Sequence, residues 1–207
     1  MVSETSTPGD SQAPDDPEGE ASNESKKRLH HHLIEWGVLL VLALVVTFGL
    51  RTFAFQTFFI PSDSMNPTLQ QGDRIIVDKL SVRFGTINRG DILVFNSPPS
   101  EDCTGGHDPV LIKRVIGLPG DSLYSVGDTI YVNNKPLKEA WPHEEPLGPP
   151  AIAAKNHPVV VTANHYYMMG DNHPDSCDSR YWGTITRSEV IGKAFVRVWP
   201  LSRLGFL

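Results

Sequence analysis

The 207-residue sequence has no surplus of positive charge. It contains 18 lysine and arginine residues against 24 aspartate and glutamate residues, a formal net charge of -6. No basic stripe offsets this acidity, and proteins that bind nucleic acid need one to neutralise phosphates. We therefore expect no nucleic-acid partner, and the length suits one globular body with appendages.

Two catalytic signatures are also missing. No serine lies in a Gly-x-Ser-x-Gly elbow, which would indicate a histidine-dependent hydrolase. The segment His143-Glu144-Glu145-Pro146-Leu147 lacks the second histidine of a zinc-protease motif. The sequence therefore gives no indication of a catalytic metal.

Large apolar side chains are scarce in residues 1–25, which are rich in Ser, Pro, Gly, Asp and Glu. Such a segment cannot bury enough surface to offset the entropy of ordering. Residues 1–32 are therefore predicted to form a disordered acidic tail that ends in a basic cluster. Its expected role is that of a solvated leader, with a docking or regulatory role as the alternative.

One long apolar run extends from Leu33 to Leu50 and is interrupted only by Glu35. At about 1.5 Å per residue, roughly 18 helical residues nearly cross a hydrocarbon core, and the next few residues can complete the crossing. A cleaved secretory signal would have a shorter apolar core and a small-x-small exit, whereas this run leads into Arg51 and aromatic residues. Residues 33–55 are predicted to be a retained transmembrane anchor.

Positive charge is distributed unequally around this run. The basic residues 26–28 precede it, and only Arg51 borders its other end. The positive-inside rule therefore places the amino-terminal tail in the cytoplasm and the rest of the chain outside the cell membrane. The histidines at 30–32 are interpreted as a solvated interfacial cluster rather than as metal ligands.

Beyond residue 60, short apolar stretches alternate with Gly, Pro, Asn and Asp, and no repeat is visible. Residues 56–207 are predicted to be a mainly β domain, with an irregular, proline-rich excursion at 138–158. Asn133-Asn134 is a plausible hairpin turn. The predicted strands are Arg74–Lys79, Asp91–Asn96, Val110–Ile116, Thr129–Val132, Val159–Thr162, Tyr166–Met169 and Lys193–Trp199.

Two short segments offer a serine nucleophile and a lysine base, namely 61–69 with Ser64 and 111–121 with Lys113. In a strand, Lys113 shares a face with Leu111 and Val115. Apolar surroundings lower a lysine pKa toward the range that a neutral-pH general base needs. Alone, each residue has an ordinary reading, because Ser64 suits a turn and a strand lysine usually keeps its charge in solvent.

The order of several motifs resolves this ambiguity. The motifs are Ser62–Leu69, Gly72–Val77, Arg89–Ile92, Lys113–Asp121, Gly170–Asn172 and Ser176–Gly183. Together they resemble, in order, the conserved boxes of bacterial type I signal peptidases, from the anchor to Trp199-Pro200-Leu201. The resemblance implies an antiparallel-sheet catalytic domain of the signal-peptidase and LexA-like type.

The resemblance also implies roles for individual residues. Ser64 would be the nucleophile and Lys113 the general base, while the Ser64 N–H and the Ser62 hydroxyl would form the oxyanion hole. Ser176 would orient the lysine amine, and Asp178 and Arg180 would support its segment. Residues aligned with the shallow substrate pockets are Ile60, Pro61, Met65, Leu69, Leu111 and Ile112. Their alternative role is ordinary core.

The implied activity is that of a membrane-bound serine endopeptidase that cleaves signal peptides from exported preproteins after small-x-small sites. The enzyme would act as a monomer at the bilayer and need no cofactor. One alternative is a self-cleaving serine/lysine protease of the LexA type, which the anchor disfavours. Another is a membrane-anchored module that binds leader peptides without cutting them.

Three residues, at two places in the chain, depart from the family pattern. Asp63 stands where the family often has glycine, beside the expected oxyanion donor. His173 and Pro174 replace an arginine and an aspartate that commonly follow Gly-Asp-Asn. These departures leave the catalytic matches intact.

The sequence contains two cysteines, Cys103 and Cys177. Because the domain is expected to face an oxidising compartment, a disulfide between them is one hypothesis. The rival hypothesis is a zinc site made by Cys103, His107, His173 and Cys177. The sequence alone leaves both open.

Overall fold

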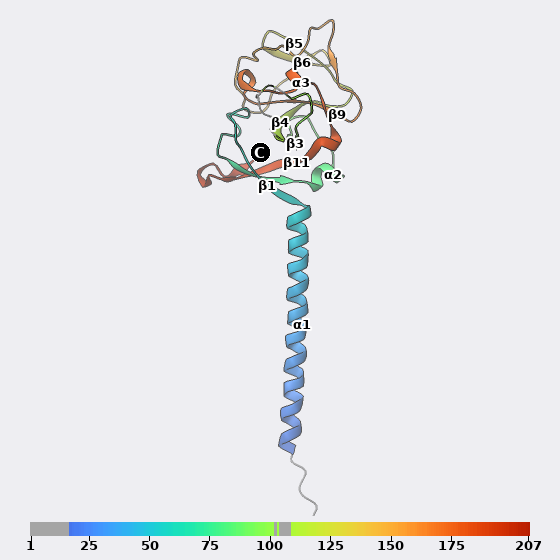
Figure 1. The fold of residues 1–207 in the computed structure, drawn as a ribbon, viewed down its shortest axis with the longest axis vertical. Coiled ribbons are helices and arrows are strands. Elements are labelled where there is room, and N and C mark those ends of the chain that lie inside the picture. Colours follow the sequence, from blue (N-terminus) through green and yellow to red (C-terminus); the bar gives the residue numbers. More distant parts are fainter. Residues whose placement is uncertain (1–16, 102, 104–108) are drawn as a thin grey trace, which may run out of the picture. The chain divides into compact units, whose positions relative to one another are not determined.

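The computed structural model describes residues 17–101, 103 and 109–207. The chain divides into two compact units, Met1–Phe48 and Gly49–Leu207. Most of the first unit is helix α1 (Pro17–Phe53), shown in blue and cyan in Figure 1. Within α1, the 18 residues His32–Gly49 have a mean hydropathy of 2.0, so this stretch is long and apolar enough to cross a membrane.

Helix α1 begins earlier than the sequence analysis predicts. Residues 17–32 are helical, so the predicted disorder is wrong for this part of the tail, while residues 1–16 lie outside the described residues. Proline at the first helical position, followed by acidic residues in the sequence, favours a helix amino terminus. The helix ends at Phe53, two residues before the predicted end of the anchor.

The second unit is built from short strands joined by turns (Figure 1). Its strands are β1 (Phe55–Phe59), β2 (Arg74–Asp78), β3 (Ile92–Asn96), β4 (Val110–Gly117), β5 (Ser122–Val126), β6 (Thr129–Val132), β7 (Lys135–Pro136), β8 (Val159–Val160), β9 (His165–Met169), β10 (Ile185–Thr186), β11 (Val190–Trp199) and β12 (Gly205–Phe206). Its helical segments are α2 (Leu80–Phe84), α3 (Ser179–Trp182) and three 3-10 turns, η1 (His173–Asp175), η2 (Arg187–Glu189) and η3 (Leu201–Arg203).

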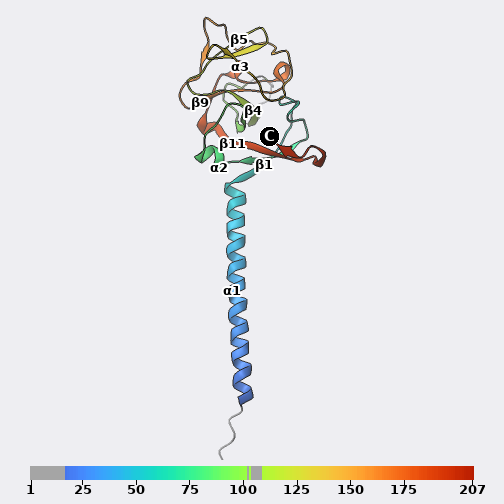
Figure 2. The same ribbon diagram turned by 180° about the vertical axis from the view of Figure 1, so that it is seen from behind.

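These strands form two antiparallel sheets. The larger has the order β1-β2-β11-β3-β4-β9-β10, with β12 paired to β11, and the smaller has the order β7-β6-β5-β8. Within this unit, β5 lies at the end opposite β1 in both views (Figures 1 and 2), and β6 lies next to it in Figure 1. The mainly β, antiparallel fold class is confirmed.

All seven predicted strands form, Thr129–Val132 with the predicted bounds and the other six with at least one shifted end. The Asn133-Asn134 turn also forms, because both residues adopt positive φ, 51° and 65°, as a two-residue hairpin between β6 and β7 requires. Strand β1 was missed because its aromatic residues follow the apolar run without a break. It pairs along its whole length with β2, from Phe55 opposite Asp78 to Phe59 opposite Arg74.

The central strand β4 differs from the alternating pattern that the sequence suggests. Lys113 and Arg114 are 4% and 5% exposed although they lie on opposite faces of the strand. Strands β3 and β9 pair with its two edges, and its two faces pack into different core clusters, Ile112 in one and Val115 in the other. Two cations are therefore desolvated at adjacent positions.

Candidate active site

Ser64 lies in the loop between β1 and β2, and this loop is closed at its base. The Ile60 N–H donates to the Asp73 carbonyl and the Gly72 N–H to the Ile60 carbonyl, both at 2.9 Å. Within the loop, Met65 and Leu69 are fully buried. The nucleophile candidate is thus carried by a loop whose apolar side chains belong to the core, which fixes its position.

Buried charge ties the same loop to the end of the chain. The Asp73 carboxylate accepts two hydrogen bonds of 3.0 Å from Arg203 and one of 2.9 Å from the Gln70 N–H. Arg197 donates to the Thr68 carbonyl at 2.5 Å. Because these donors hold loop carbonyls and a loop carboxylate together, the loop cannot shift without breaking several charge-assisted bonds.

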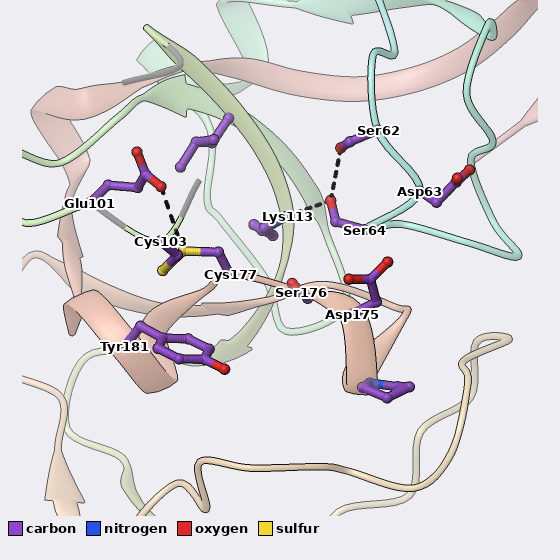
Figure 3. A pocket seen from close by; sticks show the side chains of 12 residues that line it. Ser62, Asp63, Ser64, Glu101, Cys103, Lys113, Asp175, Ser176, Cys177 and Tyr181 are labelled. Atoms are coloured by element: carbon purple, nitrogen blue, oxygen red, sulfur yellow. Dashed lines mark hydrogen bonds between the residues drawn. A yellow bond between two sulfur atoms is a disulfide. The ribbon is translucent and has the colours of Figure 1, made fainter. Parts of the chain in front are cut away.

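Lys113 projects from β4 toward this loop (Figure 3). Its Nζ lies 2.5 Å from the Ser64 Oγ. Burial lowers the pKa of Lys113 from 10.5 to about 8, although nearby carboxylates oppose the shift. The opposing carboxylates are Asp178, Asp171 and Glu101, while Arg180 adds to the lowering. At pH 7 about a tenth of the amine is then neutral, which is several hundred times the neutral fraction of an ordinary lysine.

A second hydroxyl lies beside the pair. The Ser62 Oγ is 3.4 Å from the Ser64 Oγ (Figure 3). This separation is too long for a strong hydrogen bond between hydroxyls. The Ser62 hydroxyl can instead turn toward a negative oxygen that develops next to the nucleophile.

Gly170 and Asn172, to which the sequence analysis gave no role, hold the backbone of the nucleophile. The Asn172 N–H donates to the Ser64 carbonyl at 3.1 Å, and its side-chain amide donates to the Asp63 carbonyl at 3.1 Å. A Cβ on Gly170 would lie 2.2 Å from the Ser64 carbonyl oxygen. Only glycine allows this approach of two backbones.

The Ser176 side chain faces the same cavity as Lys113. It is 6% exposed, and its hydroxyl has no hydrogen-bond partner among the described residues. The expected hydrogen bond to the lysine amine is therefore not formed in this structure, although the hydroxyl is not held by any other described group.

The side chains of Asp178 and Arg180 form a fully buried ion pair. Arg180 donates to both carboxylate oxygens, at 2.8 and 2.9 Å, and Asp178 also accepts from the Gly170 N–H at 3.2 Å. The remaining guanidinium donors bind the carbonyls of Leu147 at 2.5 Å and His173 at 2.6 Å. The pair thus joins the Gly170 backbone, the 173–182 segment and the 138–158 excursion.

A second buried ion pair involves Arg114, the residue next to Lys113 on β4. Arg114 donates to both oxygens of Asp171, at 2.7 and 2.6 Å, and Thr68 donates to the same carboxylate at 2.5 Å. The Trp141 ring lies 4.9 Å from the guanidinium carbon of Arg114. Arg114 and Asp171 both lie in motifs that the sequence analysis names, but nothing in the sequence paired them.

The two departures from the family pattern have different surroundings. Asp63 is exposed and accepts a 3.4 Å hydrogen bond from the Gln71 N–H, and Figure 3 shows its carboxylate directed away from Lys113. His173 is 3% exposed, and burial lowers its pKa to about 4. The imidazole is therefore neutral at physiological pH.

A cavity of about 490 Å³ opens over the serine and lysine pair (Figure 3). Of the six residues aligned with substrate pockets, Leu111 lines this cavity. Four others, Ile60, Met65, Leu69 and Ile112, belong to one buried core cluster, and Pro61 is exposed. For those four, the structure favours the core alternative.

Cys103 and Cys177 are joined by a disulfide at the edge of the cavity (Figure 3). The bond occupies both thiols, so they are not available as the zinc ligands of the rival hypothesis. His107, the third residue of that hypothesis, lies outside the described residues. Cys177 directly follows Ser176, so the disulfide fixes the segment that carries this hydroxyl.

A buried lysine amine within reach of a serine hydroxyl, on an antiparallel β domain preceded by an apolar helix, is the arrangement of a serine hydrolase that uses lysine as its base. Comparison with known proteins gives the family. Residues 33–199 match the family model described as "Signal peptidase, peptidase S26". The chain belongs to this family.

Two sequence relatives agree with this assignment. The chain is 40% identical over 188 residues to "Probable signal peptidase I-2" of Synechocystis sp., covering 91% of this chain and 83% of that protein. It is 37% identical over 205 residues to "Signal peptidase I" of Leptolyngbya laminosa, covering 98% and 97%. A crystal structure of a signal peptidase I from Enterococcus faecalis is 29% identical, with a TM-score of 0.41, and covers 52% of this chain and 96% of that one.

The protein is accordingly a serine endopeptidase that cleaves signal peptides, and its substrates are exported preproteins. The predictions of family and activity are confirmed. The self-cleaving repressor and the non-catalytic binding module are not supported.

Proposed function

We propose that Ser64 is the nucleophile of this peptidase and Lys113 its general base. The observation that carries the proposal is the 2.5 Å separation of their reactive atoms in a buried setting. The neutral amine accepts the Ser64 proton as the oxygen attacks the scissile carbonyl, and the resulting ammonium protonates the leaving amine. Water then hydrolyses the acyl-enzyme by the same proton path in reverse.

The Ser64 N–H and the Ser62 hydroxyl stabilise the tetrahedral intermediate. Ser62 lies next to the nucleophile, and its Oγ is 3.4 Å from the Ser64 Oγ. A donor of this kind contributes mainly in the transition state, so its loss costs roughly 10²-fold or more in rate. Ser62→Ala should therefore lower kcat more than it raises KM.

Ser176 positions the lysine amine. Its hydroxyl is buried, has no other partner among the described residues and lines the same cavity as Lys113. Asp178 and Arg180 hold the segment that carries it. Because Ser176 acts through Lys113, Ser176→Ala should also change the pH dependence of turnover, which a purely structural substitution would not do.

The substrate is the cleavage region of a preprotein with small residues at the first and third positions before the cut. Leu111 forms an apolar wall of the cavity beside Lys113. Of the six residues aligned with substrate pockets, Leu111 lines the cavity, whereas Ile60, Met65, Leu69 and Ile112 are packed in the core. The preference for small side chains therefore follows from the family resemblance.

Helix α1 anchors the enzyme in the cell membrane, with its amino terminus in the cytoplasm and the catalytic unit on the outer side. The apolar stretch His32–Gly49 supports the anchor, and the basic residues 26–28 support the orientation. The short connection of about 15 residues between Gly49 and Ser64 keeps the nucleophile within roughly 50 Å of the bilayer. Each monomer carries a complete set of catalytic residues and acts alone.

The test uses full-length Ser64→Ala and Lys113→Ala, each incubated with a preprotein that has a small-x-small site. Both variants should lose cleavage while keeping a cooperative unfolding transition. Normal turnover by either folded variant would disprove the assigned dyad. Cysteine labelling from either side of inverted vesicles, with single cysteines introduced at Ser3 and Lys155, tests the orientation separately.

A further inference from the structure

A basic cavity lies on the catalytic unit away from the serine and lysine pair. It has a volume of about 390 Å³ and is formed around α2 and the start of β11. Its lining residues are Phe53, Lys79, Leu80, Val82, Arg83, Arg187, Ser188, Val190 and Ile191. Three of them are cations and none is acidic, although the chain as a whole has a net charge of -6.

The guanidinium of Arg187 is fixed in place by neutral acceptors. Its Nη2 donates to the carbonyls of Val82 at 2.6 Å and Gly85 at 2.7 Å, and its Nη1 donates to the Tyr166 hydroxyl at 3.3 Å. No carboxylate pairs with Arg187 among the described residues. Within the described part of the chain, no negative charge therefore neutralises the guanidinium at the cavity. The two carbonyls hold the Arg187 side chain in one orientation.

The acidic residues next to the cavity are engaged elsewhere. Asp78 accepts hydrogen bonds from the N–H groups of Leu80 at 2.8 Å and Ser81 at 3.1 Å. Glu189 accepts from the backbone and hydroxyl of Thr186, at 2.5 and 2.7 Å. Both carboxylates bind local turns, and among the described residues neither forms an ion pair with Arg83 or Arg187.

Backbone pairing connects this cavity to the end of the apolar span. The Lys79 N–H donates to the Ala54 carbonyl at 2.8 Å. Ala54 follows the last residue of the span, Gly49, by only five positions. Helix α1 continues to Phe53, so at about 1.5 Å per residue these five positions rise only about 8 Å, which is close to the thickness of one headgroup layer.

Apolar side chains accompany the cations. Leu80 is 37% exposed and Phe84 is 79% exposed, and the Arg83 guanidinium carbon lies 5.7 Å from the centroid of the Phe84 ring. A small inorganic ion such as phosphate would not contact these apolar side chains. A ligand that has a negative head and a hydrocarbon part matches both features.

We propose that this cavity binds the headgroup of an anionic phospholipid, with Lys79, Arg83 and Arg187 contacting the phosphate and Leu80 and Phe84 contacting the glycerol and acyl region. The proposal rests on the membrane anchoring described under Proposed function. Each cation near an anionic lipid surface contributes about 1 kcal/mol, which corresponds to about a fivefold change in affinity. Bound lipid would hold the catalytic unit at a defined orientation on the bilayer.

The experiment measures the thermal midpoint of the full-length enzyme in neutral detergent during titration with short-chain phosphatidylglycerol. Short-chain phosphatidylcholine and inorganic phosphate are titrated in parallel. Phosphatidylglycerol should raise the midpoint at lower concentration than phosphatidylcholine, and added salt should weaken the effect. Inorganic phosphate should have little effect.

Arg83→Gln and Lys79→Gln should each weaken the response to phosphatidylglycerol about fivefold. Lys155→Gln, which removes an exposed cation from the 138–158 excursion, should leave it unchanged. An equal response to both lipids, an equal response to inorganic phosphate, or unchanged affinity in both cavity variants would overturn the proposal. Preprotein cleavage in lipid-free detergent should be normal in all three variants, so a failure of the lipid site is distinguishable from a failure of the dyad.

Discussion

Gly170 and Ser176 are so close that a Cβ on the glycine would lie 2.3 Å from the serine hydroxyl oxygen and 2.7 Å from its Cβ. The same added atom would also meet the Ser64 carbonyl. The segment that carries the candidate positioning hydroxyl and the loop that carries the candidate nucleophile therefore meet at a residue without a side chain.

Gly170→Ala should consequently impair catalysis strongly, although it adds only one methyl group. The new methyl group must displace the Ser64 backbone or the Ser176 side chain, and a misplacement of about 1 Å costs on the order of 10²-fold in rate. Preprotein cleavage under kcat conditions measures this. Gly205→Ala is the matched control, because its added Cβ would meet nothing within 4 Å. Equal activity of the two variants would show that the loop tolerates the shift.

The pH dependence of cleavage should have an acidic limb set by Lys113. Burial lowers its pKa to about 8, and only the neutral amine can accept the Ser64 proton. Activity should therefore fall as the pH drops through about 8 and level off above it. Initial rates from pH 5 to 10 give this profile for the free enzyme when substrate is well below KM. Lys113→Arg should be inactive throughout, because guanidinium does not lose its proton.

The lowered pKa of Lys113, which favours catalysis, should also make the folded protein less stable at low pH. A lysine whose pKa falls from 10.5 to about 8 on folding destabilises the folded state at low pH, where both states bind the proton. The free energy of unfolding should rise as the pH increases from about 8 to 10.5. Lys113→Met removes the buried charge, so at pH 7 it should be more stable than the parent by up to about 3 kcal/mol. Urea unfolding of the parent and the variant at pH 7 and pH 10 measures both effects. If nearby carboxylates stabilise the buried ammonium, Lys113→Met should instead be less stable than the parent at pH 7.

The helices and strands that could be predicted are those set by residues close together in the sequence. Seven strands, the turn at Asn133-Asn134 and the apolar helix follow from periodicity, turn residues and run length. The positions of Ser64 and Lys113 within bonding distance also agree with the resemblance. The early start of α1 and five strands, β1, β5, β7, β10 and β12, were missed. For α1 and β1 the reason is that helix propensity and strand pairing act where the composition looks like tail or anchor.

Contacts between distant segments could not be predicted from single residues. Asp171 was part of a quoted motif, but its bidentate bond to Arg114 depends on the register of β4 against β9. The aligned pocket residues Met65 and Leu69 face the core because the loop closes on the sheet. Such outcomes depend on which face of a loop is covered, and periodicity carries no information on loops.

The ion pair between Asp178 and Arg180 should contribute far more to stability than an exposed pair. Both side chains are fully buried, so Asp178→Asn leaves a guanidinium without a countercharge, which typically costs 3–5 kcal/mol. Asp91→Asn breaks the pair with Lys193, whose side chain is 34% exposed, and should cost less than about 1 kcal/mol. Urea unfolding of both variants compares the two. Similar losses would mean that the buried network has relaxed around the substitution.

The disulfide between Cys103 and Cys177 should stabilise the catalytic unit chiefly by restricting the unfolded chain. It closes a loop of 74 residues, for which the chain-entropy model predicts roughly 4 kcal/mol. The double variant Cys103→Ser, Cys177→Ser should therefore unfold at lower urea concentration, and a reducing agent should destabilise the parent but not the variant. Because the bond also fixes the segment next to Ser176, kcat should fall in the variant even under conditions where it is fully folded. Unchanged stability on reduction would show that packing alone holds the two segments together.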